Sequence, residues 1–391
     1  MRLLVLLSRF PYPLDKGDKL RAFHQLRCLA EEHEICLFAL TDEAVTPAAE
    51  AAVRPLCRGG LVVHRLRRPG IARNMARALA TGRPLQVGYF YEASAQRRLD
   101  ALLREFQPEH IYCQLIRMAE YLRPHAGQWP ATLDYMDVFS AGMARRAATA
   151  PAWQRPVLAL EARRLAAYEA LAFGWFGHHT IISDQDRQLI PHPDRQQIQL
   201  VLNGIDTDYF QPRPAANKTC EVLFCGNMAY HTNVDAACFL AEEIMPLVRR
   251  QHPGARLLVA GTTPAARVLA LAAPEVEISG WVPDIRAAYA AARVFVAPMR
   301  VGTGLQNKLL EAMAMRLPCV TTTLANNALR GTPGHDLEVA DTAGALAAHI
   351  SRLLADAAAA DRLAEQGHAF VKQHYNWPAA TRQLSALFGR R

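Results

Sequence analysis

The sequence between residues 292 and 323 constrains the fold more strongly than any other stretch. An apolar run, A-R-V-F-V-A-P, is followed by a loop that contains Gly302 and Gly304. Leucine, methionine and alanine then recur at helical spacing, and a second apolar run begins at Cys319. Continuous apolar runs are typical of strands buried on both faces of a parallel sheet. The order strand, glycine loop, helix, strand therefore predicts an α/β fold.

The loop before this helix is a candidate anion site. Backbone N–H groups and the positive end of the helix dipole both attract anions at a helix start. Lys308 and Glu311 lie three residues apart, so both side chains can face one side of the helix. A cation there suits a phosphate, and a carboxylate one turn on suits sugar or ribose hydroxyls. On spacing alone, an ordinary turn with a surface lysine and a surface glutamate fits equally well.

The composition is that of a globular protein with room for two domains. The chain has 391 residues, of which 51% are hydrophobic and 20% charged. Its formal net charge of +8 is spread along the chain, with a cluster between Arg65 and Arg83. Such a charge suits nucleic acid, a membrane surface or phosphorylated substrates. A concentrated basic face with stacking aromatics is missing, which disfavours a nucleic-acid binder.

The cysteines and histidines do not suggest a metal site or disulfides. The eight cysteines form no C-x-x-C pair and lie mostly in apolar runs, so we interpret them as reduced core residues of a cytoplasmic protein. His178 and His179 have no cysteine or acidic partner at ligand spacing. The apolar run after Met1 is too short for a signal segment or a membrane span and fits a buried first strand.

The first half of the chain also alternates strands and helices. Apolar runs predict strands at residues 2–7, 34–40, 110–114, 131–135 and 179–183, and helical spacing predicts helices near 20–32, 70–81 and 161–173. The loop after the first strand lacks G-x-G-x-x-G, which argues against a dinucleotide site. Gly17 lies there among charged residues, where it either lets a ligand approach the backbone or forms a solvated turn.

Two aspartates, Asp134 and Asp137, lie at the end of the predicted strand at 131–135. Carboxylates at the carboxyl end of a parallel strand face the ligand edge of the sheet. Asp134 or Asp137 is therefore a candidate base, or a group that orients an acceptor hydroxyl. Helix capping and loop hydrogen bonds explain both residues equally well. The helix at 70–81 has basic flanks suited to anionic lipid, although an ordinary basic surface helix is the simpler interpretation.

The second half repeats the α/β pattern after a turn at Asn203-Gly204. Strands are predicted at 221–225, 255–260 and 276–279, helices at 237–249 and 285–292, and a mostly helical tail from Ala343 has a break between residues 356 and 361. We therefore expect two Rossmann-like, doubly wound domains facing a central cleft. The expected ranges are residues 1–200 and 201–370, with a C-terminal helix at 371–391 that crosses back to the first domain.

Several motifs together resemble the GT-B glycosyltransferases of the large retaining group called family 4. They are V-L-N-G-I-D-T-D-Y-F-Q-P, L-F-C-G-N-M-A-Y-H-T-N-V-D-A, I-S-G-W-V-P-D-I-R-A-A-Y and G-T-G-L-Q-N-K-L-L-E-A-M-A-M-R-L-P-C-V. The N-terminal P-x-x-x-G-D-K-L-R also fits. Within this group the chain is most similar to the sugar transferases of exosortase and exopolysaccharide loci. The resemblance covers nearly the whole chain and is most specific in the second half.

The resemblance implies a donor site in the second domain. Glu311 matches the second glutamate of the E-x7-E motif, which holds the ribose of the nucleotide. The loop of Gly302, Thr303 and Gly304 matches the one whose backbone meets the diphosphate and the donor sugar. The further positions that the resemblance places at the donor are Gly17, Gly226, Asn227 and Val282.

The sequence departs from the family pattern where the donor phosphates bind. Thr303 replaces the first glutamate of E-x7-E, and the family's arginine and lysine after the first donor-domain strand fall near Asn227 and Thr232. Some other group must then stabilise the charge of the leaving diphosphate. We expect Lys308 to do so, with Arg300 as the second candidate.

Other positions are less well defined by the resemblance. Lys19 and Arg21 are further candidates to neutralise the diphosphate. The acceptor-domain histidine of the family has no clear counterpart, and Asp134, Asp137 or Arg117 occupies that region.

The expected function is transfer of a hexose from a nucleotide diphosphate sugar, UDP- or GDP-linked, to a glycan or lipid-linked acceptor in exopolysaccharide synthesis. The resemblance implies retention of configuration and a reaction without metal or further cofactor. We expect a cytoplasmic protein with peripheral contact at the inner membrane face. Two alternatives stay open: a GT-B nucleotide-sugar epimerase, and a binding protein that keeps the nucleotide pocket without transfer.

Overall fold

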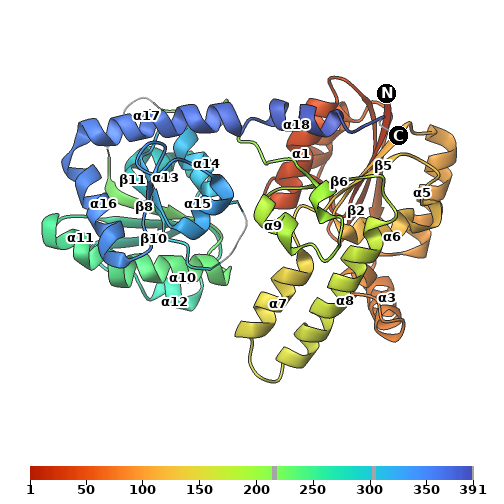
Figure 1. The fold of residues 1–391 in the computed structure, drawn as a ribbon, viewed down its shortest axis with the longest axis horizontal. Helices are drawn as coiled ribbons and strands as arrows, with labels where there is room; N and C mark the ends of the chain where they lie inside the picture. The colour runs from red at the N-terminus through yellow and green to blue at the C-terminus, as the bar shows by residue number, and fades with distance from the viewer. Residues whose placement is uncertain (214–217, 302–304, 390–391) are drawn as a thin grey trace. The chain divides into compact units, whose positions relative to one another are not determined.

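The protein consists of two compact α/β units, seen here in a computed structural model that describes residues 1–213, 218–301 and 305–389. Unit 1 comprises Met1–Asn203 and Trp377–Arg391, and unit 2 comprises Gly204–Asn376. Both boundaries lie slightly further along the chain than the expected ranges. Each unit has one parallel sheet with helices on its faces (Figure 1).

Unit 1 is built on a seven-stranded sheet in the order β3-β2-β1-β4-β5-β6-β7, with all neighbours parallel. The strands are β1 (Arg2–Leu7), β2 (Glu34–Thr41), β3 (Gly60–Arg65), β4 (His110–Gln114), β5 (Ala131–Asp134), β6 (His178–Ile181) and β7 (Gln199–Leu200). The strand order reverses at β1 and β4, and this reversal is where doubly wound sheets bind ligands.

The alternation of side chains along β1 divides unit 1 into two cores. Leu3, Val5 and Leu7 pack into one cluster, and Leu4 and Leu6 pack into the other. The helices are α1 (Gly17–Leu29), α2 (Pro47–Val53), α3 (Arg68–Ala80), α4 (Leu85–Phe90), α5 (Ala93–Phe106), α6 (Ile116–Leu122), α7 (Phe139–Thr149), α8 (Arg155–Phe173), α9 (Asp184–Leu189) and α18 (Trp377–Ser385). Short 3-10 turns lie at Arg54–Leu56, Arg123–His125 and Arg195–Gln197.

Unit 2 has a six-stranded sheet in the order β10-β9-β8-β11-β12-β13, again with parallel neighbours. The strands are β8 (Cys220–Cys225), β9 (Leu257–Ala260), β10 (Val276–Gly280), β11 (Ala292–Ala297), β12 (Cys319–Thr321) and β13 (Glu338–Val339). Here the order reverses at β8 and β11. The apolar runs that predicted these strands are buried because helices cover the sheet.

The helices of unit 2 include those that the sequence predicts. They are α10 (His231–Phe239), α11 (Met245–Gln251), α12 (Ala266–Leu269), α13 (Ile285–Ala291), α14 (Asn307–Ala314), α15 (Thr323–Leu329), α16 (Ala343–Ala355) and α17 (Ala357–His374). The helix expected at 237–249 starts earlier and contains a π-helical turn, Leu240–Ile244. The tail breaks at Asp356, whose carboxylate accepts a hydrogen bond from Ala359 N at 2.9 Å and so caps α17.

These two sheets confirm the predicted doubly wound α/β class for each unit. Within the described residues, none of the helices combines the length and the apolar character needed to cross a membrane.

Candidate active site

The carboxyl ends of β8 and β9 in unit 2 approach each other so closely that they require glycine. Gly226 follows β8 with φ of 155°, and a Cβ on it would lie 2.8 Å from Asn233 Nδ2. Gly261 follows β9 with φ of 141°, and a Cβ there would lie 1.7 Å from the Gly226 carbonyl oxygen. Larger residues would therefore force these strand ends apart. The resulting edge presents backbone and small groups rather than bulky side chains.

Lys308 brings a cation to this edge from the first turn of α14. Its Nζ donates a hydrogen bond to Asn233 Oδ1 at 2.5 Å and lies 4.9 Å from the centre of the Phe224 ring. Asn233 Nδ2 donates to the Asn227 carbonyl at 2.8 Å. Desolvation lowers the pKa of Lys308 to about 8, against the opposing charge of Glu311. Lys308 thus reaches the region of Asn227, where the sequence lacks the family's cations.

Glu311 is oriented by a buried tyrosine. The Tyr289 hydroxyl, on α13, donates to Glu311 Oε2 at 2.7 Å, and it also lies 2.9 Å from Cys225 Sγ and 3.3 Å from the Lys308 carbonyl oxygen. The Tyr289 side chain is fully buried, so this contact is fixed by packing. Desolvation raises the pKa of Glu311, while the Tyr289 hydrogen bond and Lys308 oppose the rise. The result is a carboxylate held beside a cation on one helix.

The other residues expected at the donor site have different surroundings in the structure. Val282 lies just beyond β10, half-buried and next to Trp281, whose side chain is 67% exposed. Arg300 forms ion pairs with Asp235 at 2.8 Å and Glu243 at 3.5 Å. These two carboxylates already engage its charge, so the geometry does not favour Arg300 as a diphosphate ligand. Gly302, Thr303 and Gly304 lie outside the described residues.

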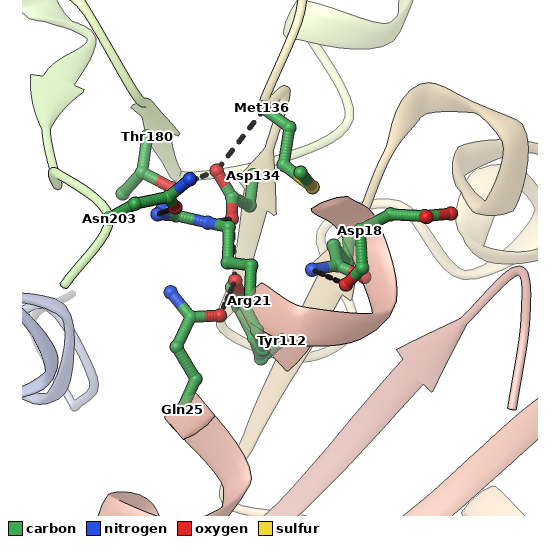
Figure 2. A network of polar contacts seen from close by, with 9 residues as sticks. Asp18, Arg21, Gln25, Tyr112, Asp134, Met136, Thr180 and Asn203 are labelled. Atoms are coloured by element: carbon green, nitrogen blue, oxygen red, sulfur yellow. Dashed lines mark hydrogen bonds and ion pairs between the residues drawn. The ribbon is translucent and has the colours of Figure 1, made fainter. Parts of the chain in front are cut away.

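In unit 1, Asp134 belongs to a buried network rather than an open site (Figure 2). Arg21 Nε donates to Asp134 Oδ2 at 2.7 Å, and Arg21 Nη1 donates to Asn203 Oδ1 at 2.8 Å. The Tyr112 hydroxyl also donates to Asp134 Oδ2, at 2.6 Å. Burial and the neighbouring carboxylate raise the pKa of Tyr112 well above its usual range. Both Arg21 and Asp134 are 0% exposed.

The second oxygen of Asp134 is engaged as well. The Thr180 hydroxyl donates to Oδ1 at 3.0 Å, and Met136 N donates to it at 3.3 Å. The carboxylate therefore joins β4, β5, β6 and α1 and is closed to reactants in this structure. The expectation that Asp134 acts as a base is not supported by this geometry, and Arg21 is likewise too buried to meet a diphosphate. Lys19 is also buried and pairs with Asp15 at 2.9 Å.

Asp137, three residues further, remains accessible at the same edge. Its side chain is exposed, yet desolvation by surrounding groups and the nearby Asp186 raise its pKa to about 6. Arg117 lies at the start of α6, with its guanidinium 5.0 Å from the Phe90 ring centre and 4.4 Å from that of Phe139. Desolvation lowers the pKa of Arg117 to about 10. A carboxyl group with a raised pKa near a desolvated arginine is suited to acid–base chemistry.

Backbone strain marks the strand ends of unit 1. Leu115 follows β4 with φ of 68°, and Met136 follows β5 with φ of 57°. Positive φ is costly for non-glycine residues, and such residues gather at functional sites. The sequence carried no signal for them, because neither is glycine or asparagine. Gly17 opens α1 with no atom within 4 Å of a Cβ placed on it, so the space beside it is open.

Some residues that contact the predicted site residues were not predicted from the sequence. Asn233 and Tyr289 hold Lys308 and Glu311 from 75 and 22 residues away, respectively. Arg9 lies in the loop after β1 and pairs with Asp18 at 2.6 Å. The only signal for Arg9 was its place directly after the first strand. Among residues 1–213, 218–301 and 305–389, no group of three or more metal-binding side chains lies together.

Comparisons with known proteins place unit 2 in a family. Residues 219–356 match Glycosyl transferases group 1. A protein from Klebsiella pneumoniae described as an uncharacterized 44.6 kDa protein in cps region is 21% identical over 395 residues, covering 96% of each chain.

Two solved structures share the fold along nearly the whole chain. Sucrose-phosphate synthase from Thermosynechococcus elongatus has a TM-score of 0.70 at 16% identity, covering 99% of this chain and 98% of that one. HepE from Anabaena in complex with UDP has a TM-score of 0.68 at 12% identity and covers 99% of both chains. The matched residues lie within unit 2, and the two solved structures share the fold of the whole chain. Unit 2 therefore contains a group 1 glycosyl transferase domain, and the chain shares the GT-B fold of these solved structures.

Proposed function

We propose that the chain transfers a sugar from a nucleotide diphosphate sugar to a glycan or lipid-linked acceptor in cell-surface polysaccharide synthesis. The observation that carries the proposal is the pair of Lys308 and Glu311 on α14, held at the carboxyl edge of the unit 2 sheet by Asn233 and Tyr289. The related protein of a cps region supports the polysaccharide context. The UDP complex of HepE supports a nucleotide donor and makes UDP the first candidate nucleotide.

In this proposal each residue has a distinct role. Glu311 binds the ribose hydroxyls, and the backbone around Val282 meets the base. As the bond from the anomeric carbon to the diphosphate breaks, negative charge grows on the leaving phosphate. Lys308 stabilises that charge, which is the usual role of a fixed cation at such a site. Asp137 accepts a hydrogen bond from the acceptor hydroxyl and takes its proton.

Two finer points rest on the family resemblance. We propose that the transferred sugar keeps its anomeric configuration. We also propose that the reaction uses no metal or further cofactor, because Lys308 and backbone N–H groups supply the neutralising charge. A cytoplasmic location, where nucleotide sugars are made, belongs to the same proposal.

A nucleotide-sugar-binding protein without transfer is the second candidate. It is favoured by Thr303, Asn227 and Thr232, which replace family residues, and by the engagement of Arg300 with two carboxylates. Formation of a glycosylated acceptor distinguishes transfer from binding. Conversion of a UDP-sugar without any acceptor would instead indicate an epimerase.

The first test is thermal stabilisation by UDP-, GDP-, dTDP- and ADP-sugars. A ligand at one hundred times its dissociation constant stabilises the folded state by about 2.7 kcal/mol. We expect one nucleotide class to raise Tm, and Lys308→Ala and Glu311→Ala to lose the shift. Arg300→Ala is the matched control, and its shift should be retained. If no nucleotide sugar raised Tm, the donor site as described would be rejected.

We also propose a peripheral membrane contact through unit 1. The exposed apolar side chains Trp153 (77%), Val157 (61%) and Leu160 (42%) follow one face at the start of α8. Leu79, at the end of α3, is 53% exposed, and its carbonyl accepts a hydrogen bond from Arg164 at 3.4 Å. Figure 1 shows α3 beside α8.

The charge on this surface is positive throughout. Residues 138–173 contain two acidic residues, Glu161 and Glu169, and both are buried. The arginines of the same segment are Arg145, Arg146, Arg155, Arg163 and Arg164. An apolar stripe flanked by cations binds anionic lipid surfaces. We refer to Trp153, Val157, Leu160 and Leu79 as the apolar stripe.

Liposome sedimentation tests this contact. Anionic vesicles at low salt should carry the protein into the pellet, and neutral vesicles should not. Trp153→Ala should weaken the binding roughly tenfold, because a tryptophan buries a large apolar area. Trp281→Ala removes an equally exposed tryptophan from unit 2 and should leave lipid binding unchanged. Equal sedimentation with both vesicle types, or none with either, would reject the contact.

A further inference from the structure

A cavity of about 1010 Å3 opens in unit 1 beyond the carboxyl ends of β2 and β3. It is formed by the loops that follow these two strands and by the start of α5. Four arginines line it: Arg65, Arg67, Arg68 and Arg98, which together we name the arginine groove. The neighbouring strands run parallel, so this opening lies on the same edge of the sheet as the ends of β1 and β4.

The two carboxylates in the wall do not neutralise the arginine groove. Glu92 accepts a hydrogen bond from the Ser94 hydroxyl at 2.7 Å and lies 3.3 Å from His64 Nε2. Asp42 accepts a hydrogen bond from the Tyr89 hydroxyl at 2.8 Å. Within the part of the chain that the structure describes, none of the four arginines pairs with a carboxylate. The four arginines outnumber the two carboxylates of the wall, so the cavity carries a net positive charge.

One of the four guanidinium groups is held in place by the backbone. Arg98 Nη1 donates to the Val63 carbonyl oxygen at 3.1 Å. Arg65, Arg67 and Arg68 are exposed and follow closely in the sequence, from the last residue of β3 to the first residue of α3. Planar guanidinium groups bind phosphate oxygens in a two-pronged manner, and several around one cavity can hold more than one phosphate.

The arginine groove is connected to the candidate acceptor residues by a row of aromatic rings. Tyr89, which binds Asp42, packs against Phe90 with ring centres 4.9 Å apart. The guanidinium groups of Arg117 and Arg9 lie 5.0 Å and 5.9 Å from the centre of the Phe90 ring. Phe90 and Tyr89 therefore link Arg117, which lies near Asp137, to the Asp42 side of the groove.

We propose that the arginine groove binds the phosphate groups of the acceptor, so that the acceptor is a phosphate-linked molecule such as a lipid diphosphate. The inference rests on the proposed function, because it names the chemical class of that acceptor. The size of the cavity is that of a small-molecule site rather than of a single ion, which leaves room for groups on either side of the phosphates.

Calorimetric titration of the full chain tests this, with UDP present in excess to occupy the donor site. The probes are a short-chain prenyl diphosphate below its micellar concentration, inorganic diphosphate, and a trimer of galacturonate. We expect both phosphate probes to bind. Arg67→Ala/Arg68→Ala and Arg98→Ala should each weaken binding about tenfold or more, since each removes a charge-assisted hydrogen bond. Arg97→Ala, next along α5 and outside the groove, is the matched control and should change affinity less than twofold.

The probes separate the sources of the phosphate. Tighter binding of the prenyl diphosphate than of inorganic diphosphate assigns the groove to a lipid-linked acceptor, and equal binding shows recognition of the phosphates alone. Both outcomes support the phosphate chemistry. Preference for the carboxylate trimer, or equal phosphate affinity in all variants, overturns it.

A separate titration with UDP keeps the two proposals distinguishable. In one outcome UDP binds, Lys308→Ala weakens UDP binding, and the arginine variants leave phosphate binding unchanged. This result would support the donor site and reject the arginine groove as a phosphate site. In the other outcome the arginine variants no longer bind the phosphate probes, and UDP does not bind to the protein. This result would support phosphate recognition by the groove and reject the donor site.

Discussion

At the residue scale, Asp134 and Asp137 differ in their surroundings although they are three positions apart. Asp134 is fully buried against the Arg21 guanidinium, whereas Asp137 is exposed. A buried ion pair contributes little in net terms, but removing one partner leaves a desolvated charge without compensation. The two aspartates should therefore respond in opposite ways to substitution.

We predict that Asp134→Ala lowers the free energy of unfolding by about 3–5 kcal/mol, because Arg21 would stay buried without a partner. Asp137→Asn should not lower it, because the neutral amide replaces a carboxylate whose ionisation is disfavoured there. It should instead lower kcat by about a hundredfold or more, as loss of a general base does. Urea denaturation and initial rates check both. A stable Asp134→Ala protein with no activity would restore Asp134 as a catalytic candidate.

The pKa of Lys308 gives donor binding a specific pH dependence. Desolvation lowers that pKa to about 8, and an adjacent diphosphate raises it again because the opposite charge favours the protonated form. Between about pH 8 and 10 the free lysine is largely neutral, so binding must take up a proton and affinity must fall as pH rises. Near pH 6 the lysine is already protonated, and uptake should vanish.

Calorimetry of a UDP-sugar in two buffers of different ionisation enthalpy measures this proton uptake. We predict close to one proton taken up at pH 9 by the native protein. Lys308→Arg should take up none, because arginine stays protonated. Uptake that persisted in Lys308→Arg would show that another group titrates.

Sequence spacing placed Lys308 and Glu311 on one face of a predicted helix, and both residues lie on α14 in the structure. It could not supply Asn233 and Tyr289, since these reach the pair only after β8, β11 and their helices assemble. The same limit explains the expectation for Asp134. The sequence alone does not distinguish a strand-end carboxylate that is buried against an arginine of α1 from one that is surrounded by solvent.

At the element scale, the α7–α8 hairpin depends on one carboxylate. Glu169 on α8 is 0% exposed and accepts hydrogen bonds from the backbone N at 3.0 Å and from the hydroxyl of Ser140, in the first turn of α7. It thereby satisfies N–H groups that a helix start leaves unpaired. Desolvation raises the pKa of Glu169 to about 7, although the Ser140 hydrogen bonds oppose the rise.

This raised pKa should make the hairpin more stable in mild acid. The native pKa lies above the unfolded value of 4.5, so the native state binds a proton that the unfolded state releases. The stabilising contribution is complete below pH 4.5 and is lost as pH rises through about 7. Its amplitude is about 3 kcal/mol, which is the free-energy equivalent of the difference between the native and unfolded pKa values.

Glu169→Gln should abolish that pH dependence, because the amide does not titrate. Hydrogen exchange in α7 at pH 5 and pH 8 measures the local stability of both proteins. We expect exchange protection, corrected for intrinsic rates, to fall between these pH values in the native protein and to stay level in the variant. A fall of the same size in both would assign the effect to another group.

The strands that sequence located best are those buried on both faces. β4 has its predicted bounds, and β1 does as well, because their apolar runs have no exposed side. β3, at the sheet edge, was missed because its side chains are half-buried and its apolar run is short. α7 was missed since its small residues, such as Ala144 and Ala147, give little periodic contrast.

At the scale of the whole molecule, unit 1 is assembled from two separate parts of the chain. α18 returns after unit 2 and contributes Leu384 to the cluster beneath α1, and Leu387 and Phe388, which follow the helix, join the same cluster. His24 of α1 stacks on Trp377 with ring centres 5.0 Å apart. Two units with separate cores need not share one unfolding transition.

We predict that Leu384→Ala lowers the stability of unit 1 by about 2–4 kcal/mol, as truncation of a fully buried leucine does. Hydrogen exchange should accelerate in α1 and β1 and stay unchanged in the strands of unit 2. Leu353→Ala, in α16, is the matched control and should reverse this pattern. Faster exchange in both units from either substitution would show that they unfold together.

The return of α18 also sets the order in which the chain can mature during synthesis. Residues 204–376 form unit 2 without interruption, whereas unit 1 needs the segment that follows them. At about 5–20 residues per second, the ribosome spends roughly 10–35 s on unit 2 after the strands of unit 1 have emerged. Throughout that interval the surface beneath α1 stays without its last helix. Nascent unit 1 therefore keeps part of its core exposed until synthesis ends, while unit 2 can complete its own core first.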